Sequence, residues 1–320
     1  MRVLFAGTPA VAVPSLDCLA GGLRASGEEG GDTGSTGLEL VGVLTRPDAP
    51  IGRRRVLTPS PVAVRAAELG LPIIKASRIT ADVTSQLAAL APDVAAIVAY
   101  GGLVPPAALG VPRRGWVNLH FSLLPAWRGA APVQHSLIHG DDVVGASTFR
   151  LEEGLDTGPV YGTLAVTPRP DVTAGELLAE LAESGAGLLK RTLEGIVDGS
   201  LAPRPQEGEP TYAPKLSLDD GRLDWSQPAR ALERRARGVT PEPGAWTVLD
   251  GERIKLEPPR LRPDVEGLAP GVLAWDGKVL LVGTATHALE LARVQPAGKK
   301  MMAAADWARG AWNTDGMRFG

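Results

Sequence analysis

The sequence predicts an α/β protein with a parallel sheet flanked by helices, followed by a smaller, mainly β domain. Over residues 1–200, short apolar runs alternate with helix-like stretches, a pattern typical of parallel strands joined by helical crossovers. After residue 215 the pattern changes to short strand-like runs broken by Gly and Pro. The stretch 201–214 is rich in Pro, Glu and Gly and lacks apolar periodicity, which predicts a linker. We therefore expect domains at 1–200 and 215–320.

The elements of the first domain follow from their local patterns. The run 94–99 contains only apolar residues, as expected for a strand buried on both faces. Ser60 followed by Pro61 predicts a helix start, because serine caps the helix and proline is preorganised for its first turn. A Gly-, Ser- and acid-rich stretch at 24–37 predicts a surface loop. The expected strands cover residues 3–6, 38–44, 72–75, 94–99 and 115–120, and the expected helices 10–23, 60–69, 81–91 and 129–139.

Two more strands and a long helix are expected before the linker. The runs 143–151 and 160–166 predict strands that lie antiparallel at the sheet edge. Thr173 and Glu176 form a capping-box pair at the head of a long amphipathic helix, which Gly199 ends. Strand-like runs of the second domain are expected at 245–249, 254–256, 271–275 and 279–282.

Composition and charge exclude several classes of protein. Hydrophobic residues make up 44% and charged residues 22%, which are ordinary globular values and exclude disordered and fibrous chains. The single cysteine, Cys18, excludes an internal disulfide framework, so we expect a cytoplasmic protein. An amino terminus without secretory features and the lack of a long apolar run argue against export and membrane insertion. A net charge of -3 means that any contact with a polyanion must be local.

Polar side chains gather on the expected strand 115–120. Because side chains alternate across a strand, Asn118 and His120 project to one face, at the carboxyl end where ligands bind in such sheets. Asp156, in a glycine-rich turn, could orient His120 and share protons with it. Two plainer interpretations stay open, namely a core histidine bonded to a neighbour and an Asp-Thr-Gly turn without further role.

These residues carry a resemblance to a known family. Asn118-Leu119-His120 followed by Ser122-Leu123-Leu124-Pro125, with Asp156 in Gly-Leu-Asp-Thr-Gly, resembles the signature of the folate-dependent formyltransferases. Further motifs run over nearly the whole chain and resemble the members that act on methionyl-tRNA. These motifs lie at 5–9, 45–48, 59–62, 127–132, 212–213, 215–216 and 295–300.

The resemblance implies a fold, a reaction and its partners. It implies an N-terminal Rossmann-like sheet and a smaller C-terminal β-barrel-like (OB-type) domain that binds tRNA. The implied reaction moves the formyl group of 10-formyltetrahydrofolate, a co-substrate, to the α-amino group of methionyl initiator tRNA for translation initiation. No metal and no tightly bound cofactor are implied, and we expect a monomer.

The resemblance also assigns roles to single residues. Asn118 and His120 would hold the oxyanion of the tetrahedral intermediate, a contribution of roughly 3 kcal/mol per donor in comparable sites. Asp156 would stabilise the protonated imidazole and help to remove a proton from the attacking amine. The residues expected against the folate are Ser122, Leu123, Leu124 and Pro125, although a loop that merely packs stays open for the two leucines.

The tRNA partner needs local cations, because its phosphates are negative. The triple arginine that follows Gly52 corresponds to the basic loop by which the family contacts the acceptor stem, with Arg53 foremost. A solvated arginine surface without function is the plainer interpretation. The expected tRNA-binding residues are Arg53, Arg54, Arg55, Lys215, Lys299 and Lys300.

Two other functions remain to be distinguished. A formyltransferase that acts on an amino-sugar nucleotide would share Asn118, His120 and Asp156, so only the second domain and the arginine loop discriminate. A metal-dependent hydrolase is suggested by His135 and His139, which share a helix face at i, i+4 spacing. That pair lacks the glutamate of a His-Glu-x-x-His motif and an evident third ligand.

Overall fold

The computed structural model describes residues 1–21, 37–52, 54–310 and 316–320, so most of the loop expected at 24–37 lies outside the described residues. The chain divides into two compact units. The second unit takes in two stretches, 130–143 and 167–177, that lie within the domain expected at 1–200. The first unit comprises Met1–Gly129, Val144–Val166 and Leu178–Tyr212, and the second Ala130–Val143, Thr167–Leu177 and Ala213–Gly320.

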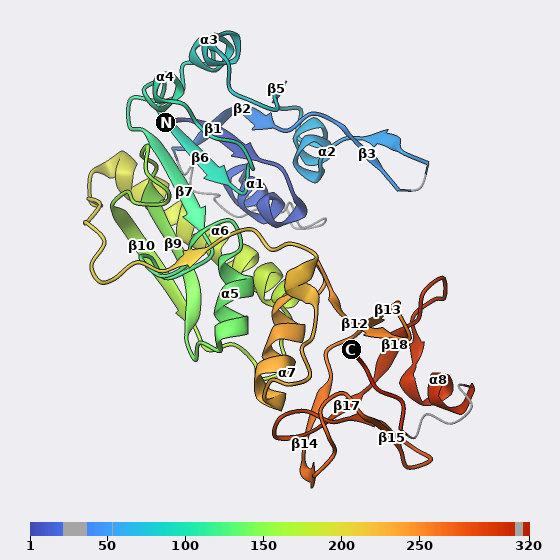
Figure 1. Cartoon of the computed structure of the whole chain (residues 1–320). Coiled ribbons are helices and arrows are strands. Elements are labelled where there is room, and N and C mark those ends of the chain that lie inside the picture. Colours follow the sequence, from blue (N-terminus) through green and yellow to red (C-terminus); the bar gives the residue numbers. More distant parts are fainter. Residues whose placement is uncertain (22–36, 53, 311–315) are drawn as a thin grey trace, which may run out of the picture. The chain divides into compact units, whose positions relative to one another are not determined.

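A seven-stranded sheet of order β10-β9-β7-β6-β1-β2-β5 forms the centre of the first unit (Figure 1). Five strands are parallel to their neighbours, and β9 and β10 are antiparallel at one edge, which confirms the expected edge pair. The strands are β1 (Arg2–Gly7), β2 (Glu39–Thr45), β5 (Ile73–Lys75), β6 (Val94–Val98), β7 (Trp116–His120), β9 (Val144–Arg150) and β10 (Val160–Val166).

Short helices connect the parallel strands. The Ser60 hydroxyl accepts from Ala63 N at 3.0 Å, so α2 begins with the predicted serine cap and proline. The helix expected at 10–23 is a 3-10 turn followed by a short α-helix that ends at Leu19. On one sheet face, Leu87 of α3 and Ala108 of α4 pack with Trp116 in a buried cluster. These elements are η1 (Ala10–Ala12), α1 (Val13–Leu19), α2 (Pro61–Glu68), α3 (Ala81–Ala89) and α4 (Pro106–Leu109).

The long helix α6 (Ala174–Asp198) confirms the predicted capping box. Thr173 N donates to Glu176 Oε2 at 2.9 Å, and Glu176 N donates to Thr173 Oγ1 at 3.3 Å. Gly199 follows with a φ of 74°, which glycine adopts without strain. Leu119 of β7 packs against this helix at Gly185, where a Cβ atom would lie 3.1 Å from Leu119 Cδ2. The opposite face of β7 therefore carries Asn118 and His120.

Two short strand pairs interrupt the expected pattern. The antiparallel hairpin of β3 (Ala49–Ile51) and β4 (Val56–Thr58) carries the arginine loop at its tip. A second pair joins β8 (Arg128–Gly129) and β11 (Tyr212–Ala213). Because Arg128 and Gly129 belong to β8, the helix expected at 129–139 begins later, at Pro132.

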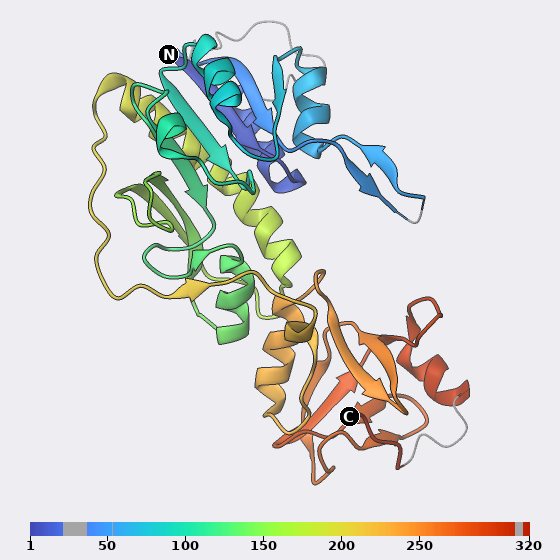
Figure 2. The ribbon, with the colours of Figure 1, turned by 45° about the horizontal axis from the view of Figure 1, so that its top comes forward.

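The second unit contains two antiparallel four-stranded sheets, β12-β13-β18-β19 and β14-β17-β16-β15 (Figures 1 and 2). Both sheets share one buried core with α7 and α8, which includes Trp225, Leu232, Leu289 and Phe319. The predicted fold class, a helix-flanked sheet with a smaller barrel-like (OB-type) β domain, is confirmed. Its helices are α5 (Pro132–His139), η2 (Asp219–Gly221), α7 (Ala229–Gly238) and α8 (Ala304–Gly310). Its strands are β12 (Ala245–Leu249), β13 (Glu252–Leu256), β14 (Arg260–Glu266), β15 (Leu273–Trp275), β16 (Leu280–Val282), β17 (His287–Leu291), β18 (Arg293–Gln295) and β19 (Met302–Ala303).

Candidate active site

His120, the last residue of β7, lies buried between two polar groups. Its Nε2 donates to the carbonyl oxygen of Trp127 at 2.9 Å, since a carbonyl oxygen can only accept. Its Nδ1 lies 3.8 Å from Oδ2 of Asp156. Burial lowers the pKa of His120, while the Asp156 carboxylate and the Trp127 carbonyl act in the opposite direction and raise it. Burial therefore disfavours the protonated imidazole, while a carboxylate placed beside it favours that form.

Asp156 is held in the turn between β9 and β10 by main-chain contacts. Its Oδ2 accepts from Gly129 N at 2.8 Å, and its side chain is only 12% exposed. Its own backbone has a φ of 50°, the left-handed region that aspartate tolerates better than most residues. One carboxylate oxygen thus faces both His120 and the start of the loop that leads to α5. The structure brings Asp156 and His120 together, as the sequence led us to expect.

Asn118 lies two residues before His120 on the same strand face. It pairs in register with Ile97 of β6 and Phe149 of β9, and its side chain is half-buried. Among the described residues, none forms a hydrogen bond with the Asn118 carboxamide. Its two N–H donors are therefore available to a ligand at the carboxyl end of the sheet.

The loop 122–125 follows His120 directly and is fixed by Ser147 of β9. Ser147 Oγ donates to Ser122 O at 2.7 Å and accepts from Leu124 N at 3.1 Å. Ser122 Oγ donates to Ala126 O at 2.5 Å. Leu123 packs beside Gly145, where a Cβ atom would lie 2.7 Å from Leu123 Cδ2. These hydrogen bonds hold the loop in place, and Leu123 packs against the sheet, as the plainer interpretation allows.

Sequence reasoning missed Ser147 and two residues of the expected linker, Gln206 and Thr211. Ser147 stands opposite His120 in the β7–β9 register, a position that could be found once the two strands are paired. Trp127 N donates to Thr211 Oγ1 at 2.8 Å, and Gln206 bonds to the Asp156 turn. Neither linker residue belongs to a periodic segment, so no pattern in the sequence points to them.

The arginine loop forms the tip of the β3–β4 hairpin, which extends away from the sheet (Figures 1 and 2). Arg54 and Arg55 are exposed there, while Arg53 lies outside the described residues. The hairpin also exposes large apolar side chains, with Val56 59% and Leu57 69% exposed. The hairpin therefore carries both cations and apolar side chains into solvent.

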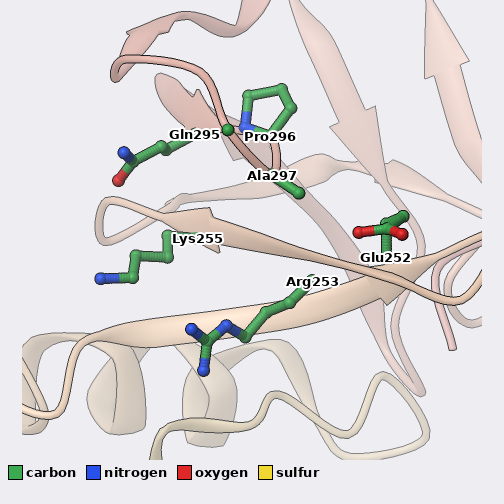
Figure 3. A pocket seen from close by; sticks show the side chains of 7 residues that line it. Glu252, Arg253, Lys255, Gln295, Pro296 and Ala297 are labelled. Atoms are coloured by element: carbon green, nitrogen blue, oxygen red, sulfur yellow. The ribbon is translucent and has the colours of Figure 1, made fainter.

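The expected lysines of the second unit are exposed. They are Lys215, near the start of the unit's main segment, and Lys299 and Lys300, in the turn between β18 and β19. A pocket of about 400 Å³ lies at the same turn and receives Arg253 and Lys255 from β13 (Figure 3). The Cζ atoms of Arg222 and Arg253 lie 5.8 and 5.9 Å from the centroid of the Trp246 ring. The remaining pocket residues are Glu252, Gln295, Pro296, Ala297 and Gly298.

The histidine pair that suggested a metal site is engaged otherwise. His135 Nε2 donates to Pro214 O at 2.9 Å, and His139 Nδ1 lies 2.8 Å from Asp141 Oδ1. Within the described ranges, no group of three or more His, Cys, Asp or Glu side chains could hold a metal ion. In the same part of the chain, no helix is both long and apolar enough to span a bilayer.

Comparison with known proteins identifies the family. The sequence matches formyl transferase over residues 28–193 and the formyl transferase C-terminal domain over 215–311. The methionyl-tRNA formyltransferase of Paenarthrobacter aurescens (strain TC1) is 68% identical over 310 residues, which is 97% of each chain. That of Arthrobacter sp. (strain FB24) is 63% identical over 319 residues, which is 100% of each chain.

Solved structures share the fold. An N-formyltransferase from Helicobacter canadensis, in complex with folinic acid and dTDP-3-aminofucose, has a TM-score of 0.67 at 13% identity. The alignment covers 92% of this chain and 99% of that one, and at this identity it supports the fold alone. The sequence matches decide the assignment: this chain belongs to the formyl transferase family and, within it, to the methionyl-tRNA formyltransferases.

Proposed function

We propose that this protein transfers the formyl group of 10-formyltetrahydrofolate to the α-amino group of methionyl initiator tRNA. The observation that carries the proposal is the buried His120–Asp156 pair beside Asn118, at the carboxyl end of β7. Family membership supports the reaction class, and the whole-length similarity to methionyl-tRNA formyltransferases supports the acceptor. As a step in translation initiation, the reaction takes place in the cytoplasm, and we expect the enzyme to act as a monomer.

The three polar residues divide the work of the reaction. The amine nitrogen attacks the formyl carbon, and the carbonyl oxygen becomes an oxyanion that the Asn118 carboxamide N–H stabilises, together with His120 once it is protonated. Neutral His120 accepts the proton that the attacking amine loses, and Asp156 stabilises the resulting imidazolium. The carbon–N10 bond then breaks, and N10 of tetrahydrofolate takes up, as it leaves, the proton that His120 accepted from the amine, which returns His120 to its neutral form. A neutral resting histidine fits this role, because only the neutral form can accept the proton.

The folate is proposed to bind as a co-substrate against the loop after β7. The residues proposed for this contact are Ser122, Leu123, Leu124 and Pro125. The support is local: Ser147 fixes the loop beside His120, so a donor held there presents its formyl group next to the catalytic pair.

The tRNA is proposed to contact exposed cations of both units. Residues 1–200 are the proposed catalytic domain, 201–214 the linker and 215–320 the tRNA-binding domain. The exposure of the hairpin arginines and of the lysines supports this proposal, since phosphates are bound by accessible cations. The proposed tRNA-binding residues are Arg53, Arg54, Arg55, Lys215, Lys299 and Lys300.

The acceptor is tested with purified enzyme and 10-formyltetrahydrofolate carrying a labelled formyl group. The enzyme is offered either methionyl initiator tRNA or an amino-sugar nucleotide, and the labelled product is separated and counted. We expect the label on the tRNA, as formylmethionine. Label found only on the sugar would overturn the proposed acceptor while leaving formyl transfer itself in place.

A further inference from the structure

The segment 204–211, which the sequence predicts to be a linker, is hydrogen-bonded to the loops next to His120. It is the yellow segment after α6 in Figures 1 and 2. Its start is fastened to β10, since Arg204 N donates to Val160 O at 2.8 Å and Val160 N donates to Arg204 O at 2.7 Å. It then runs along the active-site loops as far as Thr211. A segment fastened in this way can transmit its position to the groups it touches.

Both the nitrogen and the oxygen of the Gln206 carboxamide form hydrogen bonds next to Asp156. Its Nε2 donates to Asp156 O at 2.7 Å and to Gly158 O at 2.8 Å. Its Oε1 accepts from the Arg128 guanidinium, at 2.6 Å from Nη2 and 3.1 Å from Nε. The turn that presents the Asp156 carboxylate, with its left-handed backbone, is thus bonded to the loop after His120 through one side chain.

Thr211 forms hydrogen bonds with the loop that contacts the other side of His120. Its Oγ1 accepts from Trp127 N at 2.8 Å, and its carbonyl oxygen accepts from Arg128 N at 2.9 Å. Trp127 also has a left-handed backbone, with a φ of 59°, and its carbonyl oxygen is the partner of His120 Nε2. Both neighbours of the imidazole, the Asp156 carboxylate and the Trp127 carbonyl, therefore sit on backbone that this segment holds.

We propose that Gln206 and Thr211 are positioning residues, which set the two contacts of His120 from a segment outside the catalytic sheet. The expected effect on turnover rests on the proposed function, whereas the positioning of His120 by these two residues does not. Loss of either side-chain contact frees one left-handed loop, lets water reach the imidazole and misplaces the group that orients it. The expected effect is on turnover, since neither side chain is placed among the residues proposed to bind folate or tRNA.

Isosteric variants test the proposal. Thr211→Val removes the hydroxyl and keeps the shape, and Thr211→Ser keeps the hydroxyl. Gln206→Glu retains the acceptor for Arg128 but loses both donors to the Asp156 turn, and Gln206→Met loses all four bonds. We expect kcat to fall about tenfold or more in Thr211→Val, Gln206→Glu and Gln206→Met, with KM for both substrates changed less than about twofold. Thr211→Ser should recover most of kcat, and Glu207→Gln, an exposed neighbour, serves as the control.

A second readout does not depend on activity. The chain has 4 histidines, so the ring proton signals of His120 can be assigned by NMR and followed with pH. Burial lowers the pKa of His120, whereas the Asp156 carboxylate and the Trp127 carbonyl raise it, so displaced loops should shift the His120 titration away from that of the wild type in Thr211→Val and Gln206→Met. An inactive wild-type enzyme would refute the proposed function and leave this readout valid. An active wild type with unchanged kcat and unchanged titration in these variants would overturn the positioning role, as would a loss of thermal stability alone.

Discussion

Replacing Asp156 by Asn removes the charge beside His120 and leaves most of the turn intact. Oδ2 of Asp156 lies 3.8 Å from His120 Nδ1, and both side chains are largely buried, with 12% and 7% exposed. The asparagine oxygen can still accept from Gly129 N, which now donates to the carboxylate at 2.8 Å. The substitution therefore tests the charge rather than the fold. We expect kcat to fall about 10²–10³-fold, with a thermal unfolding midpoint close to that of the wild type.

The magnitude follows from the distance between the two groups. At 3.8 Å and an effective dielectric constant of about 20, a carboxylate stabilises an imidazolium by about 4 kcal/mol. Loss of that full amount from the transition state corresponds to about a thousandfold in rate. The dipole of the asparagine amide returns part of the interaction, so the expected loss lies between about a hundredfold and a thousandfold.

Initial rates with labelled 10-formyltetrahydrofolate and methionyl initiator tRNA, measured as a function of pH, provide the assay. Activity of the wild type should fall toward acid as His120 becomes protonated and can no longer accept a proton. In Asp156→Asn this acid limb should move to lower pH, because the charge that raises the pKa of His120 is gone. Glu153→Gln, an exposed acid of the same loop, is the matched control. A kcat within about threefold of the wild type and an unmoved acid limb would refute the role assigned to Asp156.

Three further predictions concern the loop, the hairpin and the buried histidine. Ser147→Ala leaves Leu124 N and Ser122 O without their buried hydrogen-bond partner. The free energy of unfolding, measured by urea titration, should therefore fall by about 1–3 kcal/mol, and the KM for 10-formyltetrahydrofolate, measured from initial rates, should rise. Unchanged values of both quantities would contradict the dependence of the loop on Ser147. Arg54→Ala should raise the KM for methionyl-tRNA and leave the KM for the folate constant. The slope of the logarithm of tRNA affinity against the logarithm of salt concentration should become smaller by about one, because one phosphate contact is lost. An equal rise in both KM values would contradict an RNA contact. The pKa of His120 is lowered in the folded state, so on acidification the unfolded chain binds a proton at this residue before the folded chain does. The contribution of His120 to the free energy of unfolding is therefore complete above about pH 6.5 and is lost as the pH falls from there toward the pKa of the folded state. Denaturant titrations at several pH values should show that the free energy of unfolding falls less steeply toward acid in His120→Gln than in the wild type. An equal fall in both proteins would refute the lowered pKa of His120.

The sheet and half of the site follow from patterns within single segments. The buried run of β6 is apolar throughout, and the alternation in β7 places Asn118 and His120 on one face. The caps of α2 and α6 are also local, because each joins residues three positions apart. These features depend on neighbours in the chain, so a sequence pattern can predict them.

The elements that differ from the sequence prediction depend on distant partners. Arg128 and Gly129 pair as β8 with β11, and this delays the start of α5 to Pro132. The β3–β4 hairpin forms from short, exposed strands that carry no buried alternation. In the same way, β14 is largely exposed and lacks the apolar run that marks β12. Each of these elements depends on hydrogen bonding to a partner strand, which the local amino-acid composition does not predict.

The sequence by itself determined the α/β class, the strand that carries Asn118 and His120, and the kinship with formyltransferases. Only the tertiary structure decided which groups touch the imidazole. The Trp127 carbonyl and the Asp156 carboxylate meet it from loops that Gln206 and Thr211 hold, across about 50 to 84 positions of sequence. The physical reason is that helices and strands repeat with a short period, whereas a single hydrogen bond between distant loops leaves no period to read.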